Sequence, residues 1–470
     1  MNYFVQSKFK LILHFLLLIN SSTFAANCNV PTSGDATVPS SCDFSGAQIS
    51  VNGILKLTGG NQVANDEAAL VKMTRIGFGR WFDMSDNDKA EFSYLHFSGG
   101  SWSDGCTFPR RESAACQKYP NNFDHGWGLF IRVRGNRGAI TLNYCVIADM
   151  IATMGVIKTI NTENEAQGIR GFHFVASYTA FRRNSNVDRL EYMTNQRLSG
   201  LYGSPLFEIE VNHEDRSVTI DHCTFDSNDS LSGGGILKIR LCSHISVTSD
   251  CQSESVQQIG TITNSIFSNN IINKAWHVEI FGGKDAIVKD TKFKNNKRSF
   301  YTRSGSKQIC ENADACRGDM EYSHGAALRF NEIQTALVER VEFDGNLNLP
   351  EDICSGNIIN AVCFARGAAL MVSNQAWTKG GVHFNTKVID STFKDNKAIL
   401  GGAAIFIFTT NAQLWSHTVD IDEITTFVGN SAQDQMNNFG IISNFGSRSA
   451  HMINFLQCQP GKFNSLIFVL

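Results

Sequence analysis

The chain has 470 residues, with 44 acidic and 41 basic side chains and a formal net charge of −3. Lysine and arginine are scattered along it, so no positive field favours nucleic acid, and nucleic-acid binding is excluded as the main function. There are 34 phenylalanines, only 7 prolines and 13 cysteines, which suits stacked strands in an oxidising compartment.

Residues 1–25 have the organisation of a secretory signal. Lys8 and Lys10 precede a short apolar run at 11–19, and small residues follow at 21–25. The run is too short to span a membrane. We therefore expect a secreted or surface-held protein with no transmembrane span after the signal.

Residues 27–95 are expected to form an N-terminal cap and the first coils of the fold. Ile49–Leu57 alternates apolar and polar residues, as a half-buried strand does. Asp83–Glu91 contains four carboxylates that could hold a hard cation, but it lacks the glycine and oxygen pattern of an EF-hand loop. We interpret this stretch as a solvated turn without metal.

An aromatic insertion follows at 97–128, and residues 151–170 and 185–205 are less regular and are expected to project. The insertion could bind sugars or a protein, but we favour a loop whose aromatic residues fold onto the body of the protein. Its aromatic residues include Trp102, Phe108, Tyr119 and Trp127.

One short unit recurs along the chain, and Val218–Asn228 is its clearest copy. An apolar residue is followed by a small residue and then by Phe-x-x-Asn. Asparagine tolerates the left-handed conformation of a turn, and asparagines at one corner of successive coils could bond one another while the phenylalanine rings stack inside. The seven units are Phe181/Asn184, Phe225/Asn228, Phe267/Asn270, Phe293/Asn296, Phe343/Asn346, Phe393/Asn396 and Phe427/Asn430.

A glycine element alternates with these units and precedes an apolar strand. Gly takes turn angles freely, and Ala fits a narrow interior. Because one coil cannot bury its apolar face alone, the repeat predicts an all-β solenoid, a right-handed parallel β-helix, with coils of roughly 20–29 residues. Phe267 to Phe293 fits one coil, whereas Phe293 to Phe343 requires an extra coil or a projecting loop. The glycine elements begin at Gly233, Gly325, Gly367 and Gly401.

The alternation of Gly-Gly-Ala-Ile-type and Phe-x-x-Asn tetrapeptides resembles the polymorphic outer membrane proteins, whose passenger domains belong to the pectin-lyase-like superfamily. The resemblance covers roughly residues 170–430. It implies a surface-displayed, adhesin-like β-helix.

The cysteines are expected to staple loops, since each close pair can form a disulfide in an oxidising compartment. Cys145 and Cys223 differ, because both occupy the small inward position with a coil between them, and we expect buried free thiols. Paired C-x-x-C spacing does not occur, which argues against a metal site. The expected disulfides are Cys28–Cys42, Cys106–Cys116, Cys242–Cys251, Cys310–Cys316 and Cys354–Cys363.

Ile220–Phe225 resembles a strand of pectate lyases, which makes a polysaccharide lyase or hydrolase the main enzymatic hypothesis. Such enzymes need clustered carboxylates on adjacent coils. The positions equivalent to Asp221 do not build such a cluster, since they hold Thr263, Lys289, Glu339 and Ile389.

The first hypothesis is therefore a non-enzymatic, secreted or surface-displayed β-helix that acts as an adhesin or a structural extracellular component. The alternative is a polysaccharide lyase or hydrolase, or a carbohydrate-binding protein. No catalytic residue, cofactor or metal is assigned. The partner would be an extracellular protein or a carbohydrate, and the oligomeric state stays open.

The predicted organisation is a signal at 1–25, the β-helix at 26–455 and a short segment at 456–470. This last segment contains Cys458 and resembles the opening of an EGF-like, cysteine-rich module. Either Cys458 pairs with a distant cysteine, or the segment is the truncated start of a further module, and we favour the second alternative.

Overall fold

The computed structural model describes most of the chain between residues 26 and 455. Everything below concerns that part of the chain. The stretches outside the description are 1–25, 45–47, 63–66, 86, 102–127, 135–137, 153–154, 161–171, 187–204, 212–215, 231–234, 242–257, 273–275, 299–325, 349–366, 375–382, 399–401, 410–415, 433–437, 444–450 and 456–470.

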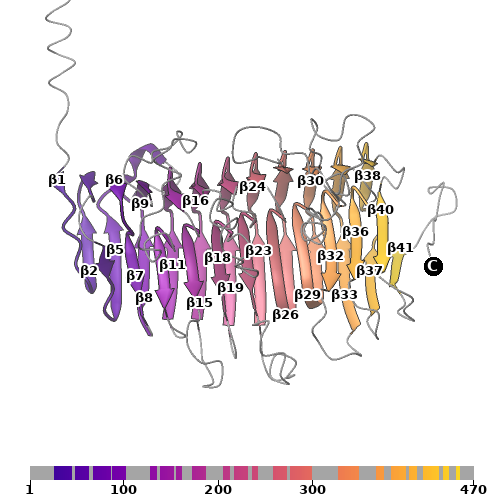
Figure 1. Cartoon of the computed structure of the whole chain (residues 1–470), viewed down its shortest axis with the longest axis horizontal. Helices are drawn as coiled ribbons and strands as arrows, with labels where there is room; N and C mark the ends of the chain where they lie inside the picture. The colour runs from indigo at the N-terminus through magenta and orange to yellow at the C-terminus, as the bar shows by residue number, and fades with distance from the viewer. Residues whose placement is uncertain are drawn as a thin grey trace, which may run out of the picture.

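The described chain is a parallel β-helix, which confirms the predicted fold class. Coils stack along the long axis from β1 at the N-terminal end to β41 near the C-terminal end (Figure 1). All strand pairs are parallel and join one coil to the next, in sheets of 20 and 21 strands. None of the described helices is long and apolar enough to cross a membrane.

The larger sheet covers two faces of each coil, here called face 1 and face 2. The strands β26 (Val278–Lys289) and β29 (Leu328–Glu339) run across both faces. Face 1 also contains β4 (Ile49–Ser50), β7 (Phe82–Met84), β10 (Ile131–Arg134), β14 (Ile157–Ile160), β18 (Phe207–Glu210), β22 (Leu237–Arg240), β32 (Leu370–Asn374), β36 (Ile405–Thr409) and β40 (Phe439–Ser443). Face 2 also contains β2 (Gly34–Val38), β5 (Ile54–Gly59), β8 (Lys89–Ser93), β11 (Gly138–Asn143), β15 (Phe172–Ser177), β19 (Arg216–Asp221), β23 (Gln258–Thr263), β33 (His383–Ile389), β37 (Ser416–Ile421) and β41 (His451–Phe455).

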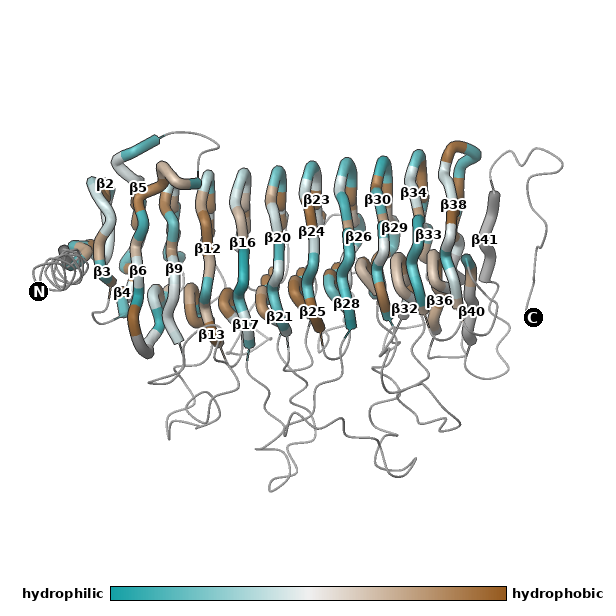
Figure 2. Tube along the Cα trace, turned by 90° about the horizontal axis from the view of Figure 1, so that it is seen from above, coloured by the Kyte–Doolittle hydropathy of each residue, from teal (hydrophilic) through white to brown (hydrophobic). Residues whose placement is uncertain are grey.

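The other sheet covers faces 3 and 4, whose strands form two neighbouring rows along the axis (Figure 2). Face 3 contains β1 (Ala26–Asn27), β3 (Cys42–Asp43), β6 (Val71–Phe78), β9 (Leu95–Ser101), β12 (Val146–Ala148), β16 (Ala180–Arg182), β20 (Thr224–Asp226), β24 (Ile266–Ser268), β27 (Lys292–Lys294), β30 (Glu342–Asp344), β34 (Thr392–Lys394) and β38 (Thr426–Val428). Face 4 contains β13 (Ile151–Ala152), β17 (Ser185–Asn186), β21 (Asp229–Ser230), β25 (Ile271–Ile272), β28 (Lys297–Arg298), β31 (Leu347–Asn348), β35 (Lys397–Ala398) and β39 (Ser431–Ala432). One 3-10 turn, η1 (Glu67–Ala69), lies beside the early coils.

The strand predicted at Ile49–Leu57 is divided between two faces. β4 lies on face 1 and β5 on face 2. Gly53 lies between them with φ +83°, a conformation that glycine adopts without strain. The alternation was correctly recognised, but it continues through a corner.

The phenylalanines of the repeat form one stack inside the helix. Phe225 pairs in register with Phe181 and Phe267, and successive rings lie 4.5–5.1 Å apart and nearly parallel from Phe181 to Phe427. Phe293 pairs directly with Phe343. The interval from Phe293 to Phe343 is therefore one coil with an insertion, and it does not contain an extra coil.

The asparagines of the repeat form a second ladder, at the corner between faces 3 and 4. The Asn270 Oδ1 accepts hydrogen bonds from the backbone N–H and the side-chain amide of Asn228, at 3.0 and 3.1 Å. The Asn270 Nδ2 donates to Asn296 Oδ1 and to the carbonyl oxygen of Phe225, both at 2.9 Å. Each amide thus uses its two donor and two acceptor sites. The same bonds recur from Asn184 to Asn430.

The later ladder asparagines, Asn346 and Asn396, correct one detail of the sequence interpretation. Both are buried, and Asn346 Nδ2 donates to Asn396 Oδ1 at 2.9 Å. Neither has the left-handed backbone expected of it, because that conformation falls one residue earlier, at Gly345 (φ +65°) and Asp395 (φ +53°). The preceding residue makes the turn, and the asparagine side chain is thereby directed into the core, where it reaches the next coil.

A column of small side chains occupies the corner between faces 2 and 3. Ser265 Oγ accepts from the Cys223 N–H at 3.1 Å and donates to the Thr263 carbonyl oxygen at 2.6 Å. Ser391 repeats this arrangement with the Val341 N–H and the Ile389 carbonyl. Hydroxyl groups therefore satisfy the buried backbone at this corner.

Glycine and alanine lie where the later coils turn onto face 1. Gly367 has φ +72°, while Ala368 and Ala369 are buried. The predicted element starts Gly233, Gly325 and Gly401 lie outside the described residues.

The predicted Cys28–Cys42 disulfide is present and joins the first coil to the residues before it. Cys145 and Cys223 are buried and free, and burial raises the pKa of each thiol to about 12. The other four predicted disulfides and the insertion's aromatic residues lie outside the described residues.

Replacing Asn270 by Asp should destabilise the fold by about 3 kcal/mol, because the carboxylate loses both donors and faces carbonyl oxygens in a buried site. The measurement is the urea midpoint of unfolding. Asn295→Asp is the matched control, since Asn295 is exposed at φ +53° and the equivalent corner of a later coil already holds Asp395. Equal midpoints for the two variants would contradict the ladder's role.

Candidate functional site

The outward-facing side chains of face 1 form a column of alternating charge on successive coils. The register pairs Lys158 with Glu208, Glu208 with Lys238, Lys238 with Glu279, and Glu279 with Arg329. We call these five residues the charged column. Their apolar neighbours in each strand point inward, so the strand period of two places every charge on the same side.

The charged column is held together by ion pairs between coils. Glu208 pairs with Lys158 and, at 3.3 Å, with Arg240. Glu279 Oε2 lies 3.0 Å from Lys238 Nζ, and its Oε1 lies 3.6 Å from Arg329 Nη1. The side chains of Glu279 and Arg329 are only 1% and 2% exposed, so these charges are stabilised by one another.

The surroundings fix the protonation state of the two acids. Burial alone would raise the pKa of Glu208, but the positive charges of Lys158, Arg240 and Lys238 outweigh it and lower the pKa to about 2. Burial also opposes the shift at Glu279, yet Lys238 and Arg329 lower its pKa. Both acids are therefore ionised at neutral pH, unlike a general acid, which must carry a proton there.

Lys238 is the base of the column whose pKa is lowered. Burial is the main cause, and the charge of Glu279 acts in the opposite sense. Its ammonium group also lies 5.4 Å from the centroid of the Trp276 ring, while the Arg329 guanidinium lies 4.2 Å from that centroid. The indole ring thus makes a cation–π contact with each of these two cations.

Polar side chains extend the column toward the C-terminal coils. Asn331 Nδ2 donates to Glu279 Oε1 at 3.1 Å, and Arg329 Nε donates to Ser373 Oγ at 2.7 Å. Further on, Met371 and Phe406 occupy the positions equivalent to Arg329. The charges therefore end where the column becomes apolar.

Asp83 begins the same row of positions and corrects the solvated-turn interpretation. It is buried, and Arg132 Nε and Nη2 donate to its two carboxylate oxygens at 2.8 and 3.0 Å. Asp88, also buried, instead accepts from the backbone N–H groups of Gly53 and Ser85. The acids point to different partners because the β7–β8 corner turns between them. Among the described residues, no three His, Cys, Asp or Glu side chains are grouped to hold a metal ion.

The predicted outer row that begins at Asp221 is aligned as expected, with Thr263, Lys289, Glu339 and Ile389 in register. Asp221 accepts hydrogen bonds from Thr263 and Asn264 at 2.6 and 2.9 Å. Lys289 and Glu339 form an ion pair at 2.8 Å. This row is polar and self-bonded.

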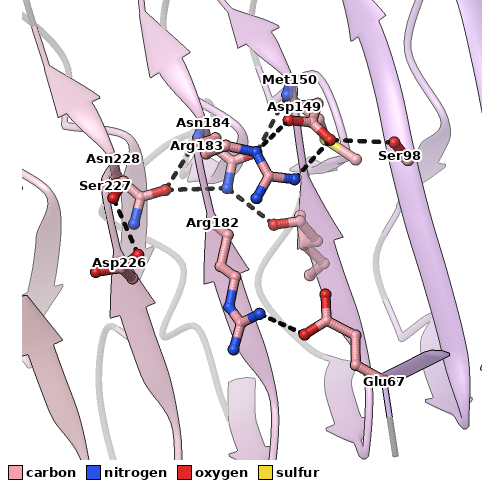
Figure 3. A network of polar contacts seen from close by, with 11 residues as sticks. Glu67, Ser98, Asp149, Met150, Arg182, Arg183, Asn184, Asp226, Ser227 and Asn228 are labelled. Carbon is pink, nitrogen blue, oxygen red and sulfur yellow. Dashed lines mark hydrogen bonds and ion pairs between the residues drawn. The ribbon is translucent and has the colours of Figure 1, made fainter.

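The corner between faces 3 and 4 carries charged pairs on its outer side (Figure 3). The Arg183 guanidinium donates to both oxygens of Asp149, at 2.7 and 3.0 Å, and Ser98 donates to the same carboxylate. Arg182 pairs with Glu67 of η1. The Arg183–Asp149 pair ties neighbouring coils together, while the Arg182–Glu67 pair joins a later coil to η1.

A row of half-buried and exposed aromatic side chains lies at the corner between faces 2 and 3. Tyr94, Tyr144, Tyr178 and His222 stack in sequence, with centroid separations of 5.1, 4.7 and 4.5 Å. We call these four residues the aromatic strip. It lies directly outside the column of small side chains that contains Cys145 and Cys223.

The sequence interpretation did not identify either the charged column or the aromatic strip. A signal existed for the column, because several strands that enter face 1 alternate apolar and charged residues, as in Phe207–Glu210 and Leu237–Arg240. The signal for the strip was a Tyr or His one residue before the small inward position. Both require the coil register, which long insertions obscure.

Comparisons with known proteins do not assign a family. No family model matches the chain, and no curated protein matches it. Among solved structures, the chain is similar to the Agl-KA catalytic domain at 9% identity and a TM-score of 0.25, over 90% of this chain and 62% of that one. The chain thus spans less than two thirds of that structure, and a likeness at this level carries no inference about activity.

Replacing Glu279 by Gln should lower the free energy of unfolding by about 3–5 kcal/mol, because Lys238 and Arg329 would remain buried without their counter-charge. Urea unfolding measures the change. The matched variant is Glu91→Gln, which breaks the exposed Lys56–Glu91 pair and should have little effect. If both substitutions act alike, the charged column is not electrostatically coupled.

The stability should also depend on pH through His277, which is buried beside Trp276. Burial lowers the pKa of His277 from 6.5 to about 4, although the carbonyl oxygens of Lys297 and Ala326 act in the opposite sense. Between these values the unfolded chain binds the proton and the folded chain does not, so stability falls as the pH drops from about 6.5 to about 4.

The expected loss reaches about 3 kcal/mol at the acid end of this window. The wild-type chain and His277→Asn should therefore differ in the slope of stability against pH. Glu208 also begins to lose its contribution below its ordinary pKa of 4.5, but it does so in both proteins, so the difference between their slopes reports His277. Parallel slopes for the two proteins would contradict the claim that His277 causes this pH dependence.

Proposed function

We propose that the protein is a secreted or surface-displayed β-helix that acts as an adhesin or a structural extracellular component without catalysis. One observation carries the proposal. The buried carboxylates of face 1 are ionised and matched with bases on neighbouring coils. This arrangement joins coils into a rigid body and leaves Glu208 unable to carry the proton that a glycosidase acid must donate.

Further observations support the extracellular location and the class of surface-displayed β-helix. The Cys28–Cys42 disulfide suits an oxidising environment, and residues 1–25 have the organisation of a secretory signal. The repeat's resemblance to the polymorphic outer membrane proteins suits surface display. A solenoid of this kind offers a long rigid side for contact with an extracellular protein or a carbohydrate.

A polysaccharide lyase or hydrolase is the second candidate, and one observation favours it. Lys238 is a base of lowered pKa that lies between the carboxylates of Glu208 and Glu279 on adjacent coils, with Arg240 on its own strand. A lyase uses such a base to remove a proton from a uronic acid whose carboxylate is neutralised by cations.

The two candidates are separated by incubating the purified protein with acidic and neutral polysaccharides, with and without Ca²⁺. Unsaturated and reducing ends are then measured. We expect no release of either, together with retention of the protein on cell surfaces or extracellular material. Product release that Lys238→Met abolishes and that Lys56→Met does not would overturn the non-catalytic proposal.

A further inference from the structure

The aromatic strip has geometry that the fold itself does not require. Tyr94, Tyr144, Tyr178 and His222 all have positive φ, between 50° and 57°. Bulky side chains are unfavourable in this left-handed conformation, which asparagine and aspartate tolerate better. The equivalent corner of a later coil holds Asn264 at φ +50°. The four early coils thus keep large rings where smaller residues would fold with less strain, as is typical of functional positions.

The three tyrosines of the strip also present their phenol groups to solvent. Tyr178 is 41% exposed, and His222 is exposed as well. In the described chain, Tyr94, Tyr144 and Tyr178 make ring contacts but no hydrogen bond through their hydroxyls. Each phenol can therefore both donate and accept a hydrogen bond.

A second polar row accompanies the rings on the same coils. Ser93, Asn143, Ser177 and Asp221 are in register on face 2, each one residue before its coil's corner. They alternate with the inward apolar residues and are partly exposed. Amide, hydroxyl and carboxylate groups thus lie beside phenol groups, with one set per coil.

We propose that the aromatic strip and its polar row bind a neutral, β-linked polysaccharide that lies along the axis of the helix, with about one sugar per coil. The inference rests on the proposed binding function and names its ligand. Ring centroids recur every 4.5–5.1 Å, close to the length of one sugar in an extended β-linked chain. Because the rings stack face to face, they present their edges and phenol hydroxyls to a ligand, and these can contact the C–H groups and hydroxyls of a sugar.

Spacing and charge exclude the other extended polymers. A peptide strand advances about 3.3 Å per residue, so it would lose register with the coils within two steps. An acidic polysaccharide would face the Asp221 carboxylate, whose pKa is lowered by the hydrogen bonds of Thr263, Asn264 and His222 although burial opposes the shift. Lysines and arginines are absent from the four positions of the strip and the four of its polar row.

The experiment measures binding of the full secreted chain to cello-oligosaccharides and chito-oligosaccharides of two to eight sugars by calorimetry. Affinity should rise with length up to about four sugars, because the strip spans four coils, and then level off. Retention on insoluble cellulose or chitin should exceed retention on an α-linked glucan and on polygalacturonate.

The key variant combines Tyr144→Asn with Tyr178→Asn. Asparagine is chosen because Asn264 already occupies the equivalent corner of a later coil. The double variant should fold normally and lose about tenfold or more in affinity. Tyr178→Phe removes the hydroxyl but keeps the ring, so it should weaken binding less than Tyr178→Asn. The matched control is Asp390→Asn, at the same corner with φ +46° but outside the strip, and it should bind as the wild type does.

The outcomes separate this inference from the proposed function. The strip is not the binding site if the chain binds no glycan, or if the double variant binds glycan as tightly as the wild type. Adhesion to cells is measured separately and still tests the proposed function. Preference for a peptide or for polygalacturonate also overturns it. Cleavage of the oligosaccharides would instead overturn the non-catalytic function.

Discussion

The closed hydrogen-bonding of the asparagine ladder is the constraint on which the rest of the structure depends. A parallel β-helix must turn corners inside its own core, and buried backbone groups at those corners need partners. The Asn228, Asn270 and Asn296 amides supply them, since each bonds the coil before it and the coil after it. Because an amide has two donors and two acceptor sites, neither aspartate nor a shorter hydroxyl side chain could replace it.

A fixed corner also fixes the register, and the register creates the surfaces on which function depends. Residues far apart in sequence, such as Glu208 and Lys238, become neighbours in one row. Burying such charges is costly, and the cost is offset only where signs alternate from coil to coil. At another corner the same register stacks Tyr94, Tyr144 and Tyr178 into a continuous strip. Face 1 therefore joins the coils, while the exposed corner is available for a ligand.

The sequence was sufficient to predict the fold, because the Phe-x-x-Asn unit carries both the buried ring and the ladder amide. The turn itself was placed one residue too late, at positions such as Asn346 and Asn396, because a preference for left-handed backbone does not show which of two neighbouring residues adopts it. The side chain that bonds the next coil must be buried, so the residue before it takes the turn.

The sequence was also sufficient to align Asp221 with Thr263. It did not reveal Glu279, since polar residues in a strand were expected to face solvent, and here they are buried. Asp83 was misread for the same reason, because its partner Arg132 is one coil away in space but 49 positions away in sequence.

Hydrogen exchange of the purified chain, with and without a cello-oligosaccharide of six sugars, tests the central claim that one register both holds the coils and builds the proposed binding strip. The account predicts that the backbone amides of Asn228, Asn270 and Asn296 exchange among the slowest in the free protein. Added sugar should then protect segments around Tyr144, Tyr178 and His222 and leave face 1 unchanged. Fast exchange at the asparagine corner, or ligand protection centred on Lys238 and Glu279, would contradict it.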